Sequence, residues 1–129
     1  MAKILVVDDS KVVREQLRAT LTRASHDVVA CENGHAGYQA ALAQDDIKLI
    51  IADYNMPEMN GLDMIQRIRK VPAYVKTPIF MLTTESSPVL KESAISMGIT
   101  AWINKPFSPA PLLAGVEKVL GMADKAVGS

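Results

Sequence analysis

Hydrophobic and polar residues follow two alternating patterns along the chain. Short, almost continuous apolar runs are typical of strands covered on both faces, and they predict strands over residues 3–7, 27–31, 47–52, 78–83 and 100–104. Between these runs apolar residues recur at helical spacing, which predicts helices over residues 11–24, 35–44, 61–71, 88–97 and 109–120. Because strands and helices alternate, the pattern predicts a parallel sheet with helices on both faces.

Polar residues lie at the ends of four of the five predicted strands. Asp8 and Asp9 follow the first strand, Asp53 follows the third, Thr83 closes the fourth and Lys105 follows the fifth. Each residue alone has an ordinary explanation as a helix cap, a strand former or a loop charge. In open parallel sheets, however, ligands bind outside the carboxyl ends of the strands, so we expect these side chains to meet at one edge.

Three carboxylates at one sheet edge require a physical explanation. Two such charges repel by roughly 4 kcal/mol at an effective dielectric constant near 20. The cluster therefore needs a cation, partial protonation or a chemical role. Carboxylate oxygens, a backbone carbonyl and waters form the octahedral site that suits Mg²⁺. A carboxylate beside Mg²⁺ can attack phosphorus to give an aspartyl phosphate, while an ammonium and a threonine hydroxyl bind phosphoryl oxygens.

Composition and charge narrow the class of protein. The chain has 129 residues, of which 49% are hydrophobic, and its 14 basic and 14 acidic residues cancel. Nothing in this balance favours binding to nucleic acid or to an anionic membrane. No apolar stretch approaches the roughly 18 residues of a transmembrane helix, and Met1 lies directly before a strand, so we expect a cytoplasmic protein. His26 and His35 show no ligand spacing and are expected at the surface.

The chain resembles the receiver domain of two-component response regulators, and within that family the stand-alone chemotaxis-type (CheY-like) members. The resemblance covers residues 3–120 and rests on Asp8-Asp9-Ser10, Asp53-Tyr54-Asn55-Met56-Pro57-Glu58-Met59-Asn60-Gly61, Thr83-Thr84 and Lys105-Pro106-Phe107. It implies an α/β, doubly wound, flavodoxin-like fold with a five-stranded parallel sheet in the order 2-1-3-4-5, which is the order known for this family, and five helices. We expect one receiver domain over residues 1–121 and a short flexible tail over 122–129, too short for an output domain.

The resemblance also implies roles for the residues at the sheet edge. Asp53 is the expected phosphoacceptor. Asp9 and Asp53 would bind Mg²⁺ directly, Asp8 mostly through water, and Asn55 through its main-chain carbonyl. Lys105 would contact the phosphoryl group, and its bond to the following proline would be cis.

Four further expectations concern switching and the lifetime of the phosphate. Thr83 would turn inward to a phosphoryl oxygen, and Asn55 and Glu85 match positions that tune dephosphorylation. Trp102 stands where the family usually carries tyrosine or phenylalanine. It either packs in the core or swings inward when Thr83 moves, and both interpretations stay open. An indole is larger than a phenol and has no hydroxyl, so we expect a weaker or biased switch.

The implied function is a phosphorylation-operated binding module in chemotaxis or motility. A histidine kinase would donate phosphate to Asp53, and a protein target would bind an apolar face formed by Ile95, Trp102, Asn104 and Leu113. Such a monomer is not an enzyme with a separate substrate, because it catalyses only its own phosphorylation and dephosphorylation.

The same residues bear on three other functions. A phosphorelay shuttle that passes phosphate to a histidine phosphotransfer domain remains open as the alternative. A phosphatase of the haloacid-dehalogenase type is disfavoured, because Asn55 stands where that family has a second aspartate. A P-loop nucleotide binder is excluded by the lack of the G-x-x-x-x-G-K-[ST] motif.

Overall fold

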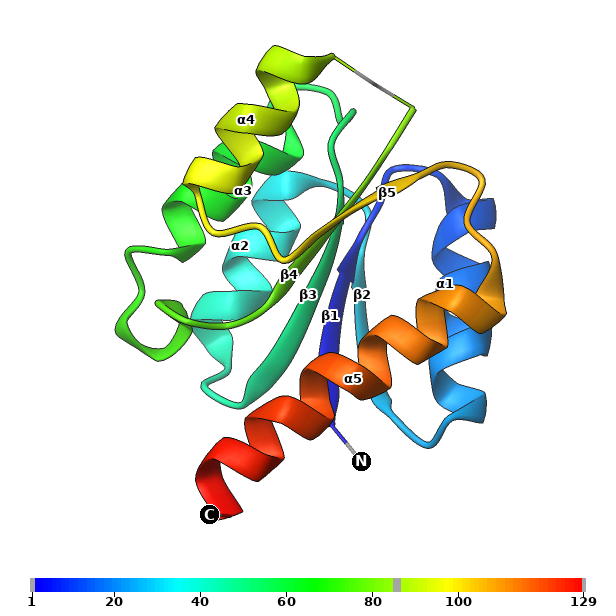
Figure 1. Ribbon diagram of the computed structural model, residues 1–129. Helices are drawn as coiled ribbons and strands as arrows, with labels where there is room; N and C mark the ends of the chain where they lie inside the picture. Colours follow the sequence, from blue (N-terminus) through cyan, green and yellow to red (C-terminus); the bar gives the residue numbers. More distant parts are fainter. Residues whose placement is uncertain (1, 85–86, 129) are drawn as a thin grey trace.

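Strands and helices alternate along the chain as predicted. The computed structural model describes residues 2–84 and 87–128, and it describes the last helix beyond Gly121 by its backbone only. Along these residues the elements are β1 Lys3–Val7, α1 Lys11–Arg23, β2 Asp27–Cys31, α2 Gly34–Ala43, β3 Ile47–Asp53, α3 Gly61–Ile68, a 3₁₀ turn η1 Pro72–Tyr74, β4 Ile79–Thr83, α4 Pro88–Ser96, β5 Ala101–Asn104 and α5 Pro109–Gly128 (Figure 1).

The strands form one parallel sheet in the order β2-β1-β3-β4-β5, which confirms the predicted fold. All four strand pairs are parallel. The chain first moves outward from β1 to β2 and then returns to place β3 on the other side of β1. In doubly wound sheets, ligands bind at the carboxyl ends of the two strands where this reversal occurs. We therefore expect a binding site at the residues that follow β1 and β3.

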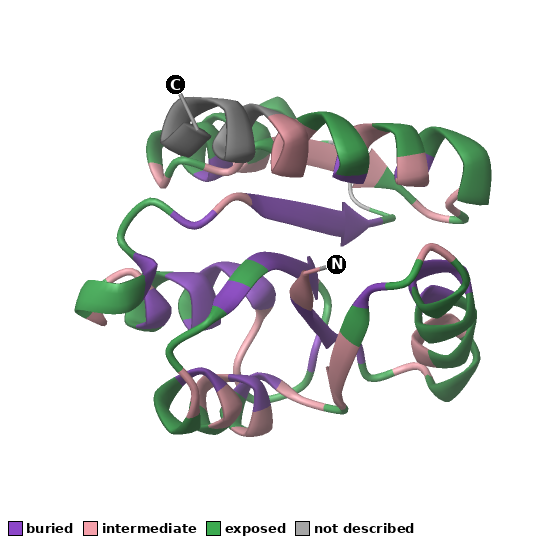
Figure 2. Ribbon diagram, turned by 90° about the horizontal axis from the view of Figure 1, so that it is seen from below, coloured by how far each residue is buried: buried purple, intermediate pink, exposed green. Residues whose placement is uncertain are grey.

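Helices cover both faces of the sheet and bury two apolar clusters. Helices α2, α3 and α4 pack on one face through residues such as Ala41, Ile65 and Ala94. Helices α1 and α5 pack on the other through Leu17 and Val116. Figure 2 shows buried residues along the central strands and on the helix sides that face them, with exposed residues outside. This arrangement explains why β1, β3 and β4 are apolar on both faces.

Helix starts follow the capping residues. The Asn33 side chain accepts a hydrogen bond from the Ala36 amide at 2.7 Å, so α2 begins at Gly34, one residue before the predicted start. The Asn60 side chain caps α3 in the same way, accepting from the Asp63 amide at 2.9 Å. Each cap satisfies a backbone donor that has no partner inside its helix.

The last helix is longer than the sequence pattern predicted. Helix α5 runs from Pro109 to Gly128, whereas the apolar spacing placed its end near Leu120. After Pro111 the chain has no proline, so every later residue keeps the backbone donor that a helix needs. The helix is continuous across residues 121 and 122, where we expected a flexible tail to begin. Among the described residues, no helix combines the length and apolarity needed to span a bilayer.

The prediction for His26 was wrong, whereas His35 is exposed as expected. His26 is only 8% exposed. Its Nδ1 atom accepts a hydrogen bond from the Ala2 amide at 3.2 Å, and its Nε2 atom lies 2.9 Å from Glu117 Oε1 on α5. The loop between α1 and β2 carries no periodic pattern, and no sequence pattern indicates that Glu117 on α5 would contact this side chain.

Candidate metal centre

The ends of β1 and β3 bring three carboxylates together. These neighbouring strands are in register, with Val7 opposite Ala52, so Asp8 and Asp53 lie side by side at the carboxyl edge of the sheet. One carboxylate oxygen from each of Asp8, Asp9 and Asp53 lies within 4.8 Å of the others. Asp8 and Asp53 are buried, and Asp9 is exposed. The acidic cluster expected from the strand ends is therefore present, with one side open to solvent.

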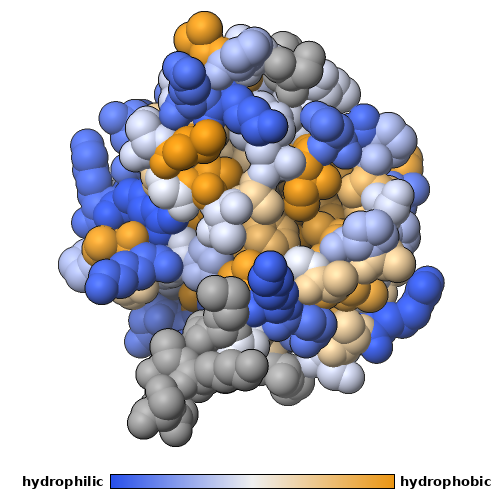
Figure 3. Space-filling view, in the orientation of Figure 1, coloured by the Kyte–Doolittle hydropathy of each residue, from blue (hydrophilic) through white to orange (hydrophobic). Residues whose placement is uncertain are grey.

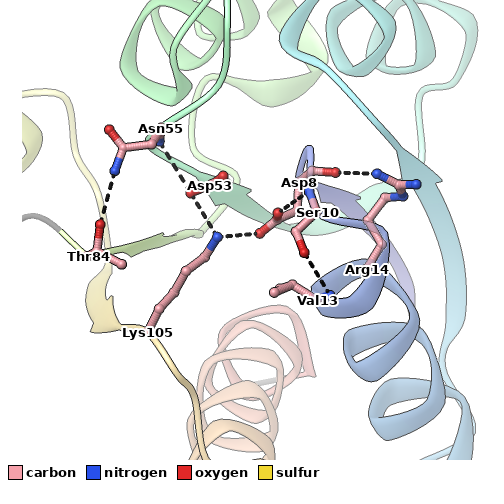
Figure 4. Close-up of polar contacts among 8 residues, drawn as sticks. All are labelled: Asp8, Ser10, Val13, Arg14, Asp53, Asn55, Thr84 and Lys105. Carbon is pink, nitrogen blue, oxygen red and sulfur yellow. Dashed lines mark hydrogen bonds and ion pairs between the residues drawn. The ribbon is translucent and has the colours of Figure 1, made fainter.

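Lys105 joins this cluster from the loop after β5. Its Nζ atom lies 2.9 Å from Asp8 Oδ2 and 3.1 Å from Asp53 Oδ1 (Figure 4). The Lys105 amide donates to the Thr83 carbonyl at 2.9 Å, and the bond to Pro106 is cis, as expected. Burial alone would lower the pKa of Lys105, but its contacts with Asp8 and Asp53 outweigh burial and raise that pKa above its ordinary value.

The Asp53 carboxyl is a weaker acid than an exposed aspartate. Burial, followed by the charge of Asp8, raises the pKa of Asp53 from 3.8 to about 6, and the contact with Lys105 opposes this rise. One Lys105 ammonium therefore only partly offsets the mutual repulsion of the carboxylates. The three carboxylates and the ammonium together leave a formal charge of −2, so the site electrostatically favours a further cation.

Backbone contacts hold Asp8 in place at the end of β1. The Ser10 amide donates to Asp8 Oδ1 at 2.9 Å, and the Asp8 amide donates to the Cys31 carbonyl at 3.1 Å. Arg14 donates from Nη1 to the Asp8 carbonyl at 2.7 Å (Figure 4). Sequence reasoning missed Arg14, which lies one helical turn beyond the Ser10 cap. The one sequence feature that could have indicated this contact is the position of Arg14 in the first turn of the helix that follows Asp8 and Asp9.

The acidic cluster fits a divalent metal. The buried Asp8 Oδ2 atom has Lys105 Nζ as an ion-pair neighbour, but it accepts no well-aligned hydrogen bond from any described residue. A buried acceptor in this condition is costly unless an ion or water completes its shell. The donors are carboxylate oxygens, which are the ligands that Mg²⁺ prefers. Asp8, Asp9 and Asp53 are the residues that would hold such an ion.

The other predicted site residues lie around this cluster. Thr83 is fully buried at the end of β4. The Asn55 amide donates to Asp53 Oδ1 at 3.2 Å, and the Asn55 side chain donates to Thr84 Oγ1 at 3.4 Å (Figure 4). Glu85 lies outside the described residues.

The predicted target-binding face lies along the edge strand β5 and the two helices beside it. Ile95 on α4 is 65% exposed, Asn104 ends β5 and is exposed, and Trp102 and Leu113 are half-buried. Trp102 packs against the cluster under α2, α3 and α4, whereas Leu113 packs against the cluster on the opposite side of the sheet. Figure 3 shows apolar surface in the region of β5, between α4 and α5.

Comparison with known proteins identifies the family of this chain. Residues 4–117 match the family described as the response regulator receiver domain. The chain belongs to this family. The match spans the acidic cluster, Thr83 and Lys105, so the residues gathered at the sheet edge all lie within the receiver domain.

This receiver domain is most usefully compared with chemotaxis proteins. It is 41% identical to the chemotaxis protein CheY homolog of Campylobacter jejuni over 120 residues, which are 92% of either chain. It is 40% identical to the chemotaxis protein CheY1 of Helicobacter pylori over 123 residues, covering 95% of this chain and 99% of that one. The structure of CheY4 of Vibrio cholerae superimposes with a TM-score of 0.87 at 39% identity, covering 92% of this chain and 98% of that one. The resemblance to CheY-like receiver domains is confirmed.

Proposed function

We propose that this receiver domain accepts a phosphoryl group on Asp53 from the phosphohistidine of a histidine kinase, in the cytoplasm and with Mg²⁺ bound. The observation that supports this proposal is the position of Asp53. Its carboxylate lies beside Asp8 and Asp9, and Lys105 Nζ lies 3.1 Å from its Oδ1 atom. A nucleophile, a site for a cation and a fixed ammonium therefore share one sheet edge.

The transfer requires little of the protein beyond positioning and charge. An Asp53 carboxylate oxygen attacks phosphorus, the bond between phosphorus and the donor imidazole nitrogen breaks, and the imidazole leaves with the electron pair and takes up a proton. Lys105 would donate hydrogen bonds to a phosphoryl oxygen and balance part of its charge, and the Thr83 hydroxyl would donate to another after transfer. Bound Mg²⁺ supplies the remaining neutralisation of the phosphoryl oxygens. The residues that would hold it are Asp8, Asp9, Asp53 and the main-chain carbonyl of Asn55.

We further propose that phosphorylation changes the affinity for a protein target in chemotaxis or motility. The target would bind a monomer at the face formed by Ile95, Trp102, Asn104 and Leu113, and Asn55 with Glu85 would set the lifetime of the phosphate. Coupling between two sites of this kind is typically about 1–3 kcal/mol and is reciprocal. A target that prefers the phosphorylated domain would therefore also favour phosphorylation of Asp53.

The test is phosphorylation by a small phosphodonor. Protein incubated with acetyl phosphate and Mg²⁺ should gain the mass of one phosphoryl group, and chelation of Mg²⁺ should prevent the gain. Asp53→Asn should gain nothing, whereas the matched control Asp45→Asn, which changes an exposed carboxyl, should behave as the unchanged protein. Incorporation into Asp53→Asn at the unchanged rate would contradict the assignment of the acceptor.

The phosphorelay shuttle is the second candidate, and the names of the relatives described above support chemotaxis signalling over it. Mixing the phosphorylated domain with histidine phosphotransfer domains distinguishes the two. Slow hydrolysis with little transfer supports the signalling function. Rapid transfer to a histidine would establish the shuttle instead.

A further inference from the structure

Tyr54, the residue after the phosphoacceptor, has its backbone fixed on two sides. Its amide donates to the Leu82 carbonyl on β4 at 2.8 Å, and its carbonyl accepts from the Gly61 amide at the start of α3 at 2.9 Å. Both contacts are main-chain hydrogen bonds between different elements. The position of Tyr54 is therefore set by the sheet and by α3, independently of its own side chain.

The first residue of α3, Gly61, lies close against the backbone of this segment. A Cβ atom on Gly61 would lie 2.4 Å from the Asp53 carbonyl oxygen and 2.9 Å from Met81 Sδ, so only glycine allows this contact. The backbone of Asp53 and Tyr54 is thus held against the first residue of α3. A displacement of this segment toward α3 would be resisted by direct atomic contact.

The Tyr54 ring reaches from this fixed backbone to Trp102. The two ring centroids are 6.5 Å apart with an angle of 41° between the ring planes, which is within the range of favourable aromatic pairs. Strand β4 separates β3 from β5, so the rings meet over β4, where Trp102 is paired with Met81. Both rings pack against the cluster under α2, α3 and α4, and both are half-buried.

We propose that Tyr54 is a positioning residue that holds Trp102, on the edge strand β5, in its resting, half-buried position. The proposal rests on the proposed function, in which Trp102 responds to phosphorylation. Because the Tyr54 backbone is fixed next to Asp53, its ring acts as a stop for the indole. Without that ring, Trp102 loses a partner that favours the resting position and gains space to move inward.

Trp102 is the only tryptophan in the chain, so its fluorescence tests the proposal directly. Acrylamide quenching of Trp102 should be measured in the unchanged protein, Tyr54→Phe and Tyr54→Ala, first alone and then with Mg²⁺ and beryllium fluoride as a phosphoryl mimic. Tyr54→Phe keeps the ring and should match the unchanged protein. In Tyr54→Ala without the mimic, the ratio of inward to resting populations should rise about 2- to 10-fold, the equivalent of one aromatic pair. Its quenching should fall accordingly, and the further change on adding the mimic should shrink.

Equal quenching in Tyr54→Ala and the unchanged protein, before and after the mimic, would overturn the proposal, as would an equal effect of Tyr54→Phe and Tyr54→Ala. If Tyr54→Ala does not fold, Tyr54→Leu replaces it, since leucine keeps apolar volume without a ring. Intact mass after acetyl phosphate is recorded for every protein. Phosphate uptake with unaltered quenching refutes the role of Tyr54 alone, whereas no uptake in any of the proteins refutes the proposed function.

Discussion

Replacing Asp53 by asparagine should make the metal-free protein more stable, although Asp53 is the residue at the centre of the site. Its buried carboxyl lies beside Asp8 and has a pKa of about 6 in place of 3.8. An amide of nearly the same shape preserves the packing and removes the charge that burial and Asp8 disfavour. The expected result is a higher free energy of unfolding for Asp53→Asn in the presence of a chelator.

The pKa of Asp53 gives the size of the effect. A pKa change of one is worth about 1.4 kcal/mol, so the rise from 3.8 to about 6 corresponds to at most about 3 kcal/mol. This net rise already includes the opposing contact with Lys105, and water screens the open side of the cluster. We therefore expect a gain of about 1–2 kcal/mol.

The direction of the pH dependence follows from the same pKa. In the unfolded chain the Asp53 carboxyl ionises near its ordinary pKa, and in the folded protein it ionises at about 6. Between these two pKa values the folded state binds a proton that the unfolded state does not. The stability contributed by protonation of Asp53 is therefore fully present below about pH 4 and is lost as the pH rises through about 6. The advantage of Asp53→Asn should be complete above that range and should shrink on acidification.

Urea unfolding followed by Trp102 fluorescence measures this difference. The comparison is made with a chelator at about pH 7.5 and about pH 4.5, with Asp45→Asn as the control for loss of an exposed carboxyl. Saturating Mg²⁺ should then stabilise the unchanged protein more than Asp53→Asn, because a ligand that binds only the folded state adds its binding free energy to stability.

Two results would refute this electrostatic reasoning. One is an Asp53→Asn protein no more stable than the unchanged protein at about pH 7.5 with a chelator, which would mean that Lys105 already compensates the carboxylates. The other is a gain that is independent of pH or is equalled by Asp45→Asn. Either result would remove the argument that the cluster needs a further cation.

Three further substitutions test contacts around the site, each by urea unfolding. Gly61→Ala places a Cβ atom 2.4 Å from the Asp53 carbonyl oxygen and should cost about 1–3 kcal/mol, and an unaltered midpoint would contradict the close contact. The Arg69 guanidinium donates to the Tyr74 and Thr77 carbonyls at 2.9 and 2.6 Å, so Arg69→Ala should lower the free energy of unfolding by about 2–4 kcal/mol. Arg69→Lys lacks the planar guanidinium and should restore only part of this free energy. Asn60→Ala removes the α3 cap and should cost about 1 kcal/mol, and a similar loss in Asn60→Asp, which can still cap, would count against this role.

The fold was predictable because its strands are short, apolar and buried on both faces. In β4 every residue from Ile79 to Thr83 is buried. An apolar run of this kind indicates a central parallel strand from its own sequence alone. The errors lie at helix ends, where apolar spacing carries little information. Asn33 starts α2 through its own side chain, and α5 continues past Leu120 although its apolar pattern fades there.

The site was predictable only as far as it follows from strand ends. Asp8, Asp53 and Lys105 meet because parallel strands end at one edge, which the alternation of elements already implies. Contacts that depend on how a side chain crosses from one element to another leave no pattern in the sequence. Arg14 on the Asp8 carbonyl is of this kind, and so is the Tyr54 ring against Trp102.

The buried His26 has a consequence for how this domain can be joined to other polypeptides. Through its contacts with the Ala2 amide and Glu117, it gathers the start of the chain and α5 at the amino edge of the sheet. Figure 1 shows both ends of the chain on the side of the sheet opposite the carboxyl edge that carries the acidic cluster. Tags or neighbouring domains attached at either end would leave the acidic edge open to a phosphodonor. A tag that displaces Ala2, in contrast, would disturb the hydrogen bond from the Ala2 amide to His26. It would thereby disturb the contact between His26 and Glu117 on α5.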